Sequence, residues 1–205
     1  MRQTAVVVAA LLAAGCGSSP KPAAPAPAPA PAPAPSGTPV APKIAAQEQY
    51  YDIHGSSVAE LRDQISRLGP AGGDDALTVW ELESQYATAR TADGCALRNV
   101  QVSLTVTTTL PRWTPPQEAH ARLLASWRTY LQRVKLHEAG HRQIAERNAR
   151  DLMAALAGLR AGTCEKLGDE ASQTVERIVA EGRLKNRAYD VETKHGQTQG
   201  VVLAP

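Results

Sequence analysis

Apolar and polar residues alternate along some stretches of the chain and recur at helical spacing along others. Alternation with a period of two predicts strands over residues 49–53, 78–88 and 95–110. Apolar positions spaced three and four apart predict helices over residues 58–68, from a cap at Thr114 to about residue 159, and over 165–185. The polar, glycine-bearing tail from residue 186 onwards is expected to be irregular.

The second and third strands form the clearest local unit of the predicted fold. Asp93-Gly94 between them is a strong hairpin signal. The apolar positions of the return strand change phase near Arg98-Asn99, which predicts a β-bulge. A straight helix to residue 159 would span about 65 Å, so we expect a kink or a break in it. The expected fold class is α+β: a small antiparallel sheet with a central hairpin, packed on the long helix and the second helix.

The first 43 residues differ in composition from the rest of the chain. Met1-Arg2 and the apolar run that follows are typical of a signal peptide, and the run ends at Cys16 in a lipobox-like sequence. We therefore expect residues 1–16 to be a signal with lipidation of Cys16, or alternatively an ordinary secretory signal. Ten of the 15 prolines lie between Pro20 and Pro42, which predicts an extended linker over residues 17–43.

The remaining residues, 44–205, are predicted to form one domain. They carry 19 Lys and Arg against 20 Asp and Glu, and this near-neutral charge argues against a nucleic-acid partner. No later segment is apolar for long enough to cross a bilayer, so any membrane attachment is expected only through a lipid on Cys16. We expect an exported, envelope-associated protein in the periplasm or on the outer surface, or alternatively a secreted one.

Cys95 and Cys164 are the two cysteines of the predicted domain. In an oxidising compartment such a pair most simply forms a disulfide, whose 69-residue loop would contribute roughly 4 kcal/mol of stability. A role as zinc ligands is the less favoured alternative, because neither cysteine has a ligand-type neighbour at close spacing.

The long predicted helix contains the sequence His137-Glu138-Ala139-Gly140-His141. Histidines four residues apart lie above one another on one helix face, and their ring nitrogens can bind one Zn²⁺ ion. The intervening Glu138 projects to one side, where it can act as general base on a metal-activated water. This is the HExxH arrangement of zinc peptidases. The histidines share their face with apolar residues, so their rings are predicted to point inward.

A catalytic zinc ion needs a third protein ligand and one open position. His195 is the preferred third ligand, because it lies in a polar segment that holds Tyr189, Asp190 and His195 close together without an evident packing reason. Such a ligand requires the tail to fold back over the helix, whereas a disordered C-terminus is the alternative. Asp190 itself is a competing ligand, and so are two carboxylates of the second helix, Glu170 and Glu181.

The order of these features resembles a bacterial family of predicted secreted zinc-dependent proteases, catalogued as a domain of unknown function. The matching residues extend from residue 48 to residue 200 and are Tyr50-Tyr51-Asp52-Ile53-His54-Gly55, Gly69-Pro70, Trp80, Gly94-Cys95, Leu110-Pro111-Arg112-Trp113, Trp127, His137-Glu138-Ala139-Gly140-His141, Cys164, Tyr189-Asp190, Thr193, His195-Gly196 and Gln199-Gly200. The resemblance implies a zincin-like fold, zinc ligation by His137 and His141, and Glu138 as the base. It also implies that the tail belongs to the site, where Tyr189 would donate to the developing oxyanion.

Two functions are compatible with this sequence. The favoured one is a zinc metallopeptidase of the cell envelope, which hydrolyses peptide bonds in a peptide or protein substrate. The alternative is a non-catalytic, zinc-stabilised interaction module of the envelope.

Overall fold

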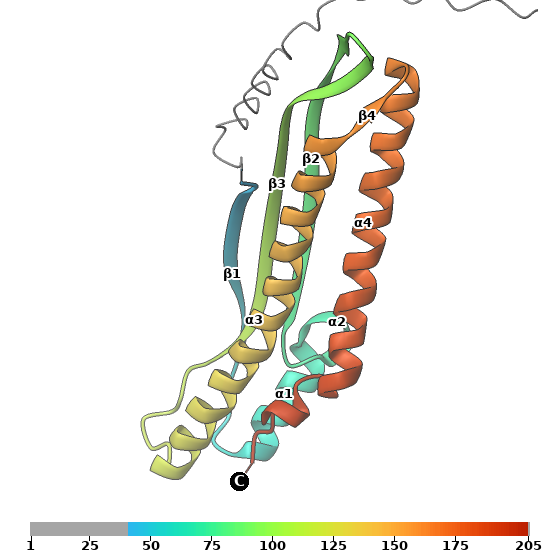
Figure 1. Cartoon of the computed structure of the whole chain (residues 1–205). Coiled ribbons are helices and arrows are strands. Elements are labelled where there is room, and N and C mark those ends of the chain that lie inside the picture. The colour runs from blue at the N-terminus through green and yellow to red at the C-terminus, as the bar shows by residue number, and fades with distance from the viewer. Residues whose placement is uncertain (1–40, 205) are drawn as a thin grey trace, which may run out of the picture. The chain divides into compact units, whose positions relative to one another are not determined.

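The computed structural model describes residues 41–204, and Figure 1 shows their arrangement. The predicted signal, the lipidation at Cys16 and nearly all of the linker lie outside these residues. Three long strands form the sheet in the order β1-β3-β2, and a short fourth strand, β4, pairs with β3. Their bounds are Lys43–Ile53 for β1, Leu77–Thr91 for β2, Gly94–Trp113 for β3 and Arg160–Ala161 for β4.

The predicted hairpin and its bulge are both confirmed. β2 and β3 pair antiparallel, and the register shifts by one residue between the pairs Gln85–Gln101 and Ala87–Arg98. Asn99 lies in this interval and has a φ of 53°, a left-handed conformation that asparagine tolerates better than most residues.

The sheet is mixed, so the prediction of an antiparallel sheet was wrong for one strand. β1 pairs with β3 in parallel along its whole length, from Lys43–Ser103 to Ile53–Trp113. A parallel pair needs a long crossover connection, and residues 54–93 supply one. β1 also begins before the predicted strand. The prediction missed its first residues because they are mostly exposed and show no apolar alternation.

Within residues 41–204, four α-helices and one 3₁₀ turn accompany the sheet. α1 (Val58–Leu68) is capped by Ser57, whose side chain accepts a hydrogen bond from the backbone N–H of Glu60. The other bounds are Pro70–Gly73 for α2, Ala121–Gly158 for α3, Cys164–Thr193 for α4 and Gln197–Gln199 for the 3₁₀ turn η1. No helix in the described part of the chain is long and apolar enough to span a membrane.

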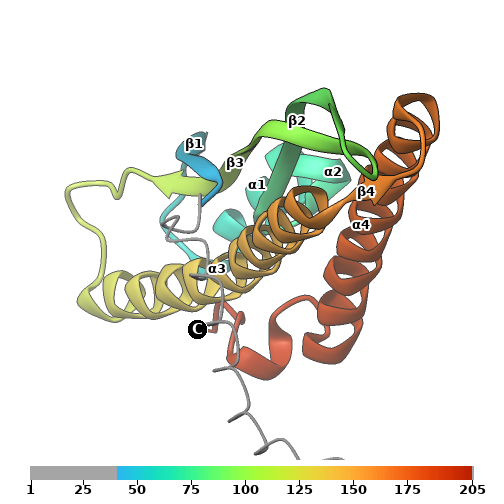
Figure 2. The same cartoon turned by 45° about the horizontal axis from the view of Figure 1, so that its top comes forward.

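The long helix α3 begins later than predicted and has no break. It begins at Ala121 after His120, while Thr114 and the two prolines after it lie outside the helix. It then continues for 38 residues without a break, about 57 Å at 1.5 Å per residue. The predicted break is therefore absent, and the helix instead curves along its length, as Figure 1 and Figure 2 show.

Helix α4 is longer than predicted and includes part of the segment expected to be irregular. It continues to Thr193 and ends with Lys194 in the left-handed conformation. The residues after it fold back onto the domain, where Val201 and Leu203 are buried in the same apolar cluster as Leu61 of α1. The C-terminal tail is therefore ordered through Ala204 and contributes to the core.

Helices α3 and α4 lie side by side against one face of the sheet (Figure 2). One core cluster fills this interface with residues of β3, α3 and α4, among them Leu104, Leu152 and Leu167. The predicted disulfide between Cys95 and Cys164 is present and joins the start of β3 to the start of α4. The fold thus fixes α4 at its N-terminal end by a covalent bond and along its length by apolar packing.

Candidate metal centre and active site

Two elements bring three ligand-type side chains together. His137 and His141 lie on the buried face of α3, as predicted, and are 6% and 7% exposed. Asp190 reaches them from α4, and one ligand atom of each of the three residues lies within 4.8 Å of the others. The two Nε2 atoms are 3.3 Å apart, and Asp190 Oδ1 lies 3.4 Å from His137 Nε2 and 2.9 Å from His141 Nε2.

Two amide side chains orient the histidine rings by contacts at Nδ1, on the side of each ring away from the converging Nε2 atoms. Gln199 Oε1 lies 3.0 Å from His137 Nδ1, and Asn186 Oδ1 lies 2.8 Å from His141 Nδ1. The amide nitrogen of Asn186 donates to the carbonyl of Gly182, so the oxygen must be the atom that faces the ring. By the same logic, the amide nitrogen of Gln199 donates to the hydroxyl of Tyr189. We therefore assign the proton of each neutral imidazole to Nδ1.

This assignment leaves three acceptors facing one another. Each Nε2 presents a lone pair, and Asp190 presents a carboxylate oxygen. Such a cluster is unfavourable unless a metal cation or a proton lies between the atoms. Two ligands bound to a tetrahedral zinc ion at 2.0–2.1 Å lie about 3.3 Å apart, which matches the observed separation of the two nitrogens. The donor set and its spacing therefore fit a small divalent metal ion.

Tyr189 of α4 packs directly against both histidines. Its ring stacks on that of His137 at 5.1 Å between centroids and meets that of His141 edge to face at 4.9 Å. Its hydroxyl donates to the main-chain carbonyl of His137. This close approach requires glycine at position 140, because a Cβ there would lie 2.2 Å from the Tyr189 hydroxyl oxygen. Tyr189 thus holds the rings in place, and its hydroxyl is already committed to α3 and Gln199.

Glu138 is buried beside the histidines, with 6% of its surface exposed. Its Oε2 atom has no hydrogen-bond partner among the described residues. Burial raises the pKa of the carboxyl group, while Thr78 and the two histidines oppose the shift. An unpartnered buried carboxylate oxygen is costly, so this atom is suited to bind a water molecule or a ligand group.

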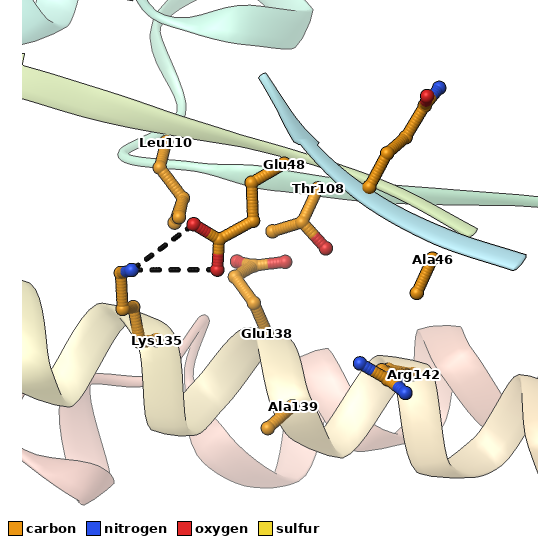
Figure 3. A pocket seen from close by; sticks show the side chains of 9 residues that line it. Ala46, Glu48, Thr108, Leu110, Lys135, Glu138, Ala139 and Arg142 are labelled. Atoms are coloured by element: carbon orange, nitrogen blue, oxygen red, sulfur yellow. Dashed lines mark hydrogen bonds and ion pairs between the residues drawn. The ribbon is translucent and has the colours of Figure 1, made fainter. Parts of the chain in front are cut away.

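Two cavities meet at Glu138. The larger, of about 880 Å³, is a cleft that also exposes His137, His141 and Asp190, and its walls come from the start of β2, from α3, from α4 and from the tail. The smaller, of about 160 Å³, lies between β1 and α3. Figure 3 shows Glu138 in this smaller cavity, where Lys135 bonds to both carboxylate oxygens of Glu48. Of the residues the structure describes, Glu138 alone lines both cavities.

The other predicted ligands lie outside the cluster. His195, the preferred third ligand, lines the cleft as an exposed residue but is not in the group of converging atoms. Its main-chain N–H instead bonds to the carbonyl of Asp190 at the end of α4. Glu170 and Glu181 form ion pairs along α4 with Lys166 and Arg177. The geometry therefore places Asp190, the alternative in the same segment, and not His195 in the group that could hold a metal ion.

Asn186, Gln199 and Gly140 are site residues to which the sequence reasoning assigned no role. Gly140 carried a usable signal, because a glycine inside a helix usually has a packing reason. Asn186 and Gln199 had no such signal in the sequence, since a lone amide in a polar segment has many possible partners. Their partners lie 45 and 62 residues away in the sequence, and only the folded chain brings them together.

Comparison with known proteins identifies the family of this chain. A family model described as a bacterial protein of unknown function (DUF922) matches residues 48–196, most of the chain. The chain belongs to this family. The match includes both histidines, Glu138 and Asp190 of this DUF922 protein, whereas Gln199 lies just beyond it. No curated protein and no solved structure matches the chain.

Proposed function

We propose that this DUF922 protein is a zinc-dependent peptidase of the bacterial cell envelope, in which a water molecule attacks a peptide bond. One observation carries the proposal. Three ligand groups converge at 2.9–3.4 Å in a cleft that also holds a buried carboxylate with a free oxygen. A structural zinc site is normally closed by four protein ligands, whereas a catalytic site has three and an open position.

The ligand set favours zinc over harder metal ions. Two imidazole nitrogens and one carboxylate oxygen are typical zinc ligands, whereas Mg²⁺ and Ca²⁺ prefer oxygen alone. A zinc ion held by His137, His141 and Asp190 would supply Lewis-acid activation of a water molecule and of the substrate carbonyl. The amides of Asn186 and Gln199 keep both Nε2 atoms free for binding, as the outer partners of ligating histidines commonly do.

Glu138 provides the acid–base chemistry in this proposal. Its carboxylate takes a proton from the attacking water as the new carbon–oxygen bond forms. It then delivers a proton to the amide nitrogen as the carbon–nitrogen bond breaks, so that the products are a carboxylic acid and an amine. The absence of a competing hydrogen bond at Oε2, among residues 41–204, leaves the atom available for this water.

In this proposal we assign Tyr189 a positioning role, in place of the oxyanion donation that the resemblance implied. Its hydroxyl donates to the backbone of α3 and accepts from Gln199, so it presents no free proton to the cleft. Its ring instead restricts the orientation of both imidazoles. Loss of the ring should therefore weaken metal binding as well as turnover.

The proposed location is the cell envelope, with attachment through a lipid on Cys16 and a peptide or protein as substrate. The disulfide between Cys95 and Cys164 supports an oxidising compartment. The bacterial family is compatible with export of the protein. The residues that would carry the signal and the lipid lie outside the described part, so this proposal rests on their sequence.

The decisive variant is Glu138→Gln, which removes the base and keeps the size of the side chain. We expect the variant to bind one equivalent of zinc with wild-type affinity and to lose nearly all hydrolysis of a broad peptide and cell-wall peptide library. Glu146→Gln is the matched control, because Glu146 lies two turns further along α3 and pairs only with arginines of the same helix. This control should bind zinc and hydrolyse like the wild type.

The same experiment separates the peptidase from the alternative, a non-catalytic zinc-stabilised interaction module. If zinc-loaded wild-type protein cleaves nothing in the library, the catalytic proposal loses its support, even with zinc bound. Equal activity of the wild type and Glu138→Gln would also contradict it, because the base would then be dispensable.

A further inference from the structure

The wall of the cleft formed by α4 carries two arginines beside the third metal ligand. Arg183 and Arg187 are four residues apart, and Asp190 follows three residues later. Residues at this spacing share one face of a helix. All three line the cleft, so this face of α4 presents two guanidinium groups and the ligand carboxylate to the same space.

These two arginines have no partner within the described part of the protein. Neither side chain takes part in any of the hydrogen bonds or ion pairs between residues 41 and 204, and both residues are exposed. Two nearby arginines are paired: Arg177 on the same helix pairs with Glu181, and Arg62, which also lines the cleft, pairs with Asp75. The cleft therefore holds two guanidinium groups that form no direct ion pair among residues 41–204, together with the carboxyl groups of Asp74, Asp75, Glu138 and Asp190 that also line it.

The positions of the arginines along α4 define where a ligand charge would lie. At a rise of 1.5 Å per residue, Arg187 is about 4.5 Å and Arg183 about 10.5 Å along the helix axis from Asp190. An extended peptide advances about 3.3 Å per residue. For a peptide that lies along α4, a group held by these side chains is thus one to three residues from the amide placed at the metal ligands.

We propose that the cleft selects substrates with a carboxylate one to three residues from the scissile amide, which Arg187 and Arg183 receive. The guanidinium group suits this ligand, because it donates two parallel hydrogen bonds to a carboxylate. The carboxylate can belong to an acidic side chain or to the free C-terminus of a short peptide. This inference rests on the proposed peptidase function for its substrate class, but the carboxylate site can be tested without turnover.

The test measures binding to zinc-loaded Glu138→Gln protein, in which bound peptides should remain intact. The probes are blocked decapeptides with a single Glu moved through every position, each paired with a Gln version, together with a free-acid and amide pair of the same peptide. We expect a window of positions at which the Glu version binds about tenfold more tightly than the Gln version, with a smaller difference at high salt. A preference for the free acid alone would assign the site to a terminal carboxylate.

Two further variants, made in the Glu138→Gln protein, test whether the preference for carboxylate peptides depends on the arginines. Arg183→Gln/Arg187→Gln should abolish it and leave zinc affinity unchanged, whereas Arg183→Lys/Arg187→Lys should retain part of it. The matched control is Arg147→Gln/Lys185→Gln, which removes the same charge at two exposed positions that do not line the cleft. This control should retain the full preference.

Each outcome supports or overturns one specific claim. If Glu and Gln peptides bind equally at every position, and free acid and amide do too, the carboxylate site is overturned, even where the wild-type enzyme cleaves peptides. A preference that survives in Arg183→Gln/Arg187→Gln overturns the assignment to these residues. An arginine-dependent preference in a protein that hydrolyses nothing keeps the carboxylate site and removes the peptidase proposal.

Discussion

Gly140→Ala tests whether the packing of Tyr189 on the histidines sets the metal site. The new Cβ would lie 2.2 Å from the Tyr189 hydroxyl oxygen and 2.3 Å from Cζ, whereas ordinary contact begins at 3.4 Å. The ring must therefore retreat by about 1 Å or rotate. Either movement disturbs its stacking on His137 and its hydrogen bond with Gln199.

The expected magnitude is a balance of two effects on stability. Replacement of a glycine by alanine inside a helix favours folding by about 1 kcal/mol, while overpacking of a buried contact costs about 1–3 kcal/mol. We expect a net loss of about 0–2 kcal/mol in the free energy of unfolding. Zinc affinity should fall more clearly, by about 10- to 100-fold, because the outer partner of His137 is displaced.

The assays are urea unfolding of the zinc-free protein and competitive zinc titration with a chromophoric chelator. Gly168→Ala on α4 is the matched control, because a Cβ there meets nothing within 4 Å. This control should gain about 1 kcal/mol of stability and retain wild-type zinc affinity. If Gly140→Ala behaves like Gly168→Ala in both assays, Tyr189 does not constrain the metal ligands and our reasoning about the site is wrong.

Four other predictions follow from the same contacts. Asp190→Asn should lower zinc affinity by at least about 100-fold, whereas His195→Asn should change it less than about threefold, as measured by competitive titration. Gln199→Ala should weaken zinc binding by about 10- to 100-fold in that titration, and wild-type affinity would refute its orienting role. The double variant Cys95→Ser/Cys164→Ser should lose roughly 4 kcal/mol of unfolding free energy in urea. Zinc removal by a chelator should speed hydrogen exchange in the last turns of α4 but not in its first turns beside the disulfide, and uniform exchange would contradict this.

The sequence predicted those parts of the site that depend on local spacing. Two histidines four residues apart must share a helix face, and the apolar residues on that face showed that it turns inward. The hairpin and its bulge were predictable for the same reason, since Asp93-Gly94 and the change of phase near Asn99 are local signals. The disulfide followed from a count of cysteines and needed no geometry.

The missed features depend on contacts between distant segments. The tail from residue 186 onwards is polar and contains glycines at 196 and 200, so its pattern favoured an irregular segment, and Asn, Tyr, Asp, Val and Thr within residues 186–193 are only mediocre helix formers. In the folded chain Tyr189 packs on two histidines of α3, and Asn186 bonds to His141 and to the carbonyl of Gly182. These tertiary contacts favour the helical conformation more than the intrinsic propensities oppose it. The extension turns Asp190 toward the cleft and leaves His195 beyond the helix end.

Because the candidate ligands come from two helices, metal binding and the docking of α4 depend on each other. Both histidines belong to α3, whereas Asp190 and Asn186 belong to α4 and Gln199 to the turn after it, so the complete site exists only when α4 is docked. A metal ion that binds only the docked state stabilises it by RT ln(1 + [metal]/Kd), about 2.7 kcal/mol at a free concentration of 100 Kd. The disulfide holds the N-terminal end of α4, and the metal would hold its C-terminal end. Zinc would thus act as a structural cross-link as well as a Lewis acid, and the loss of either contact would leave α4 fastened at one end.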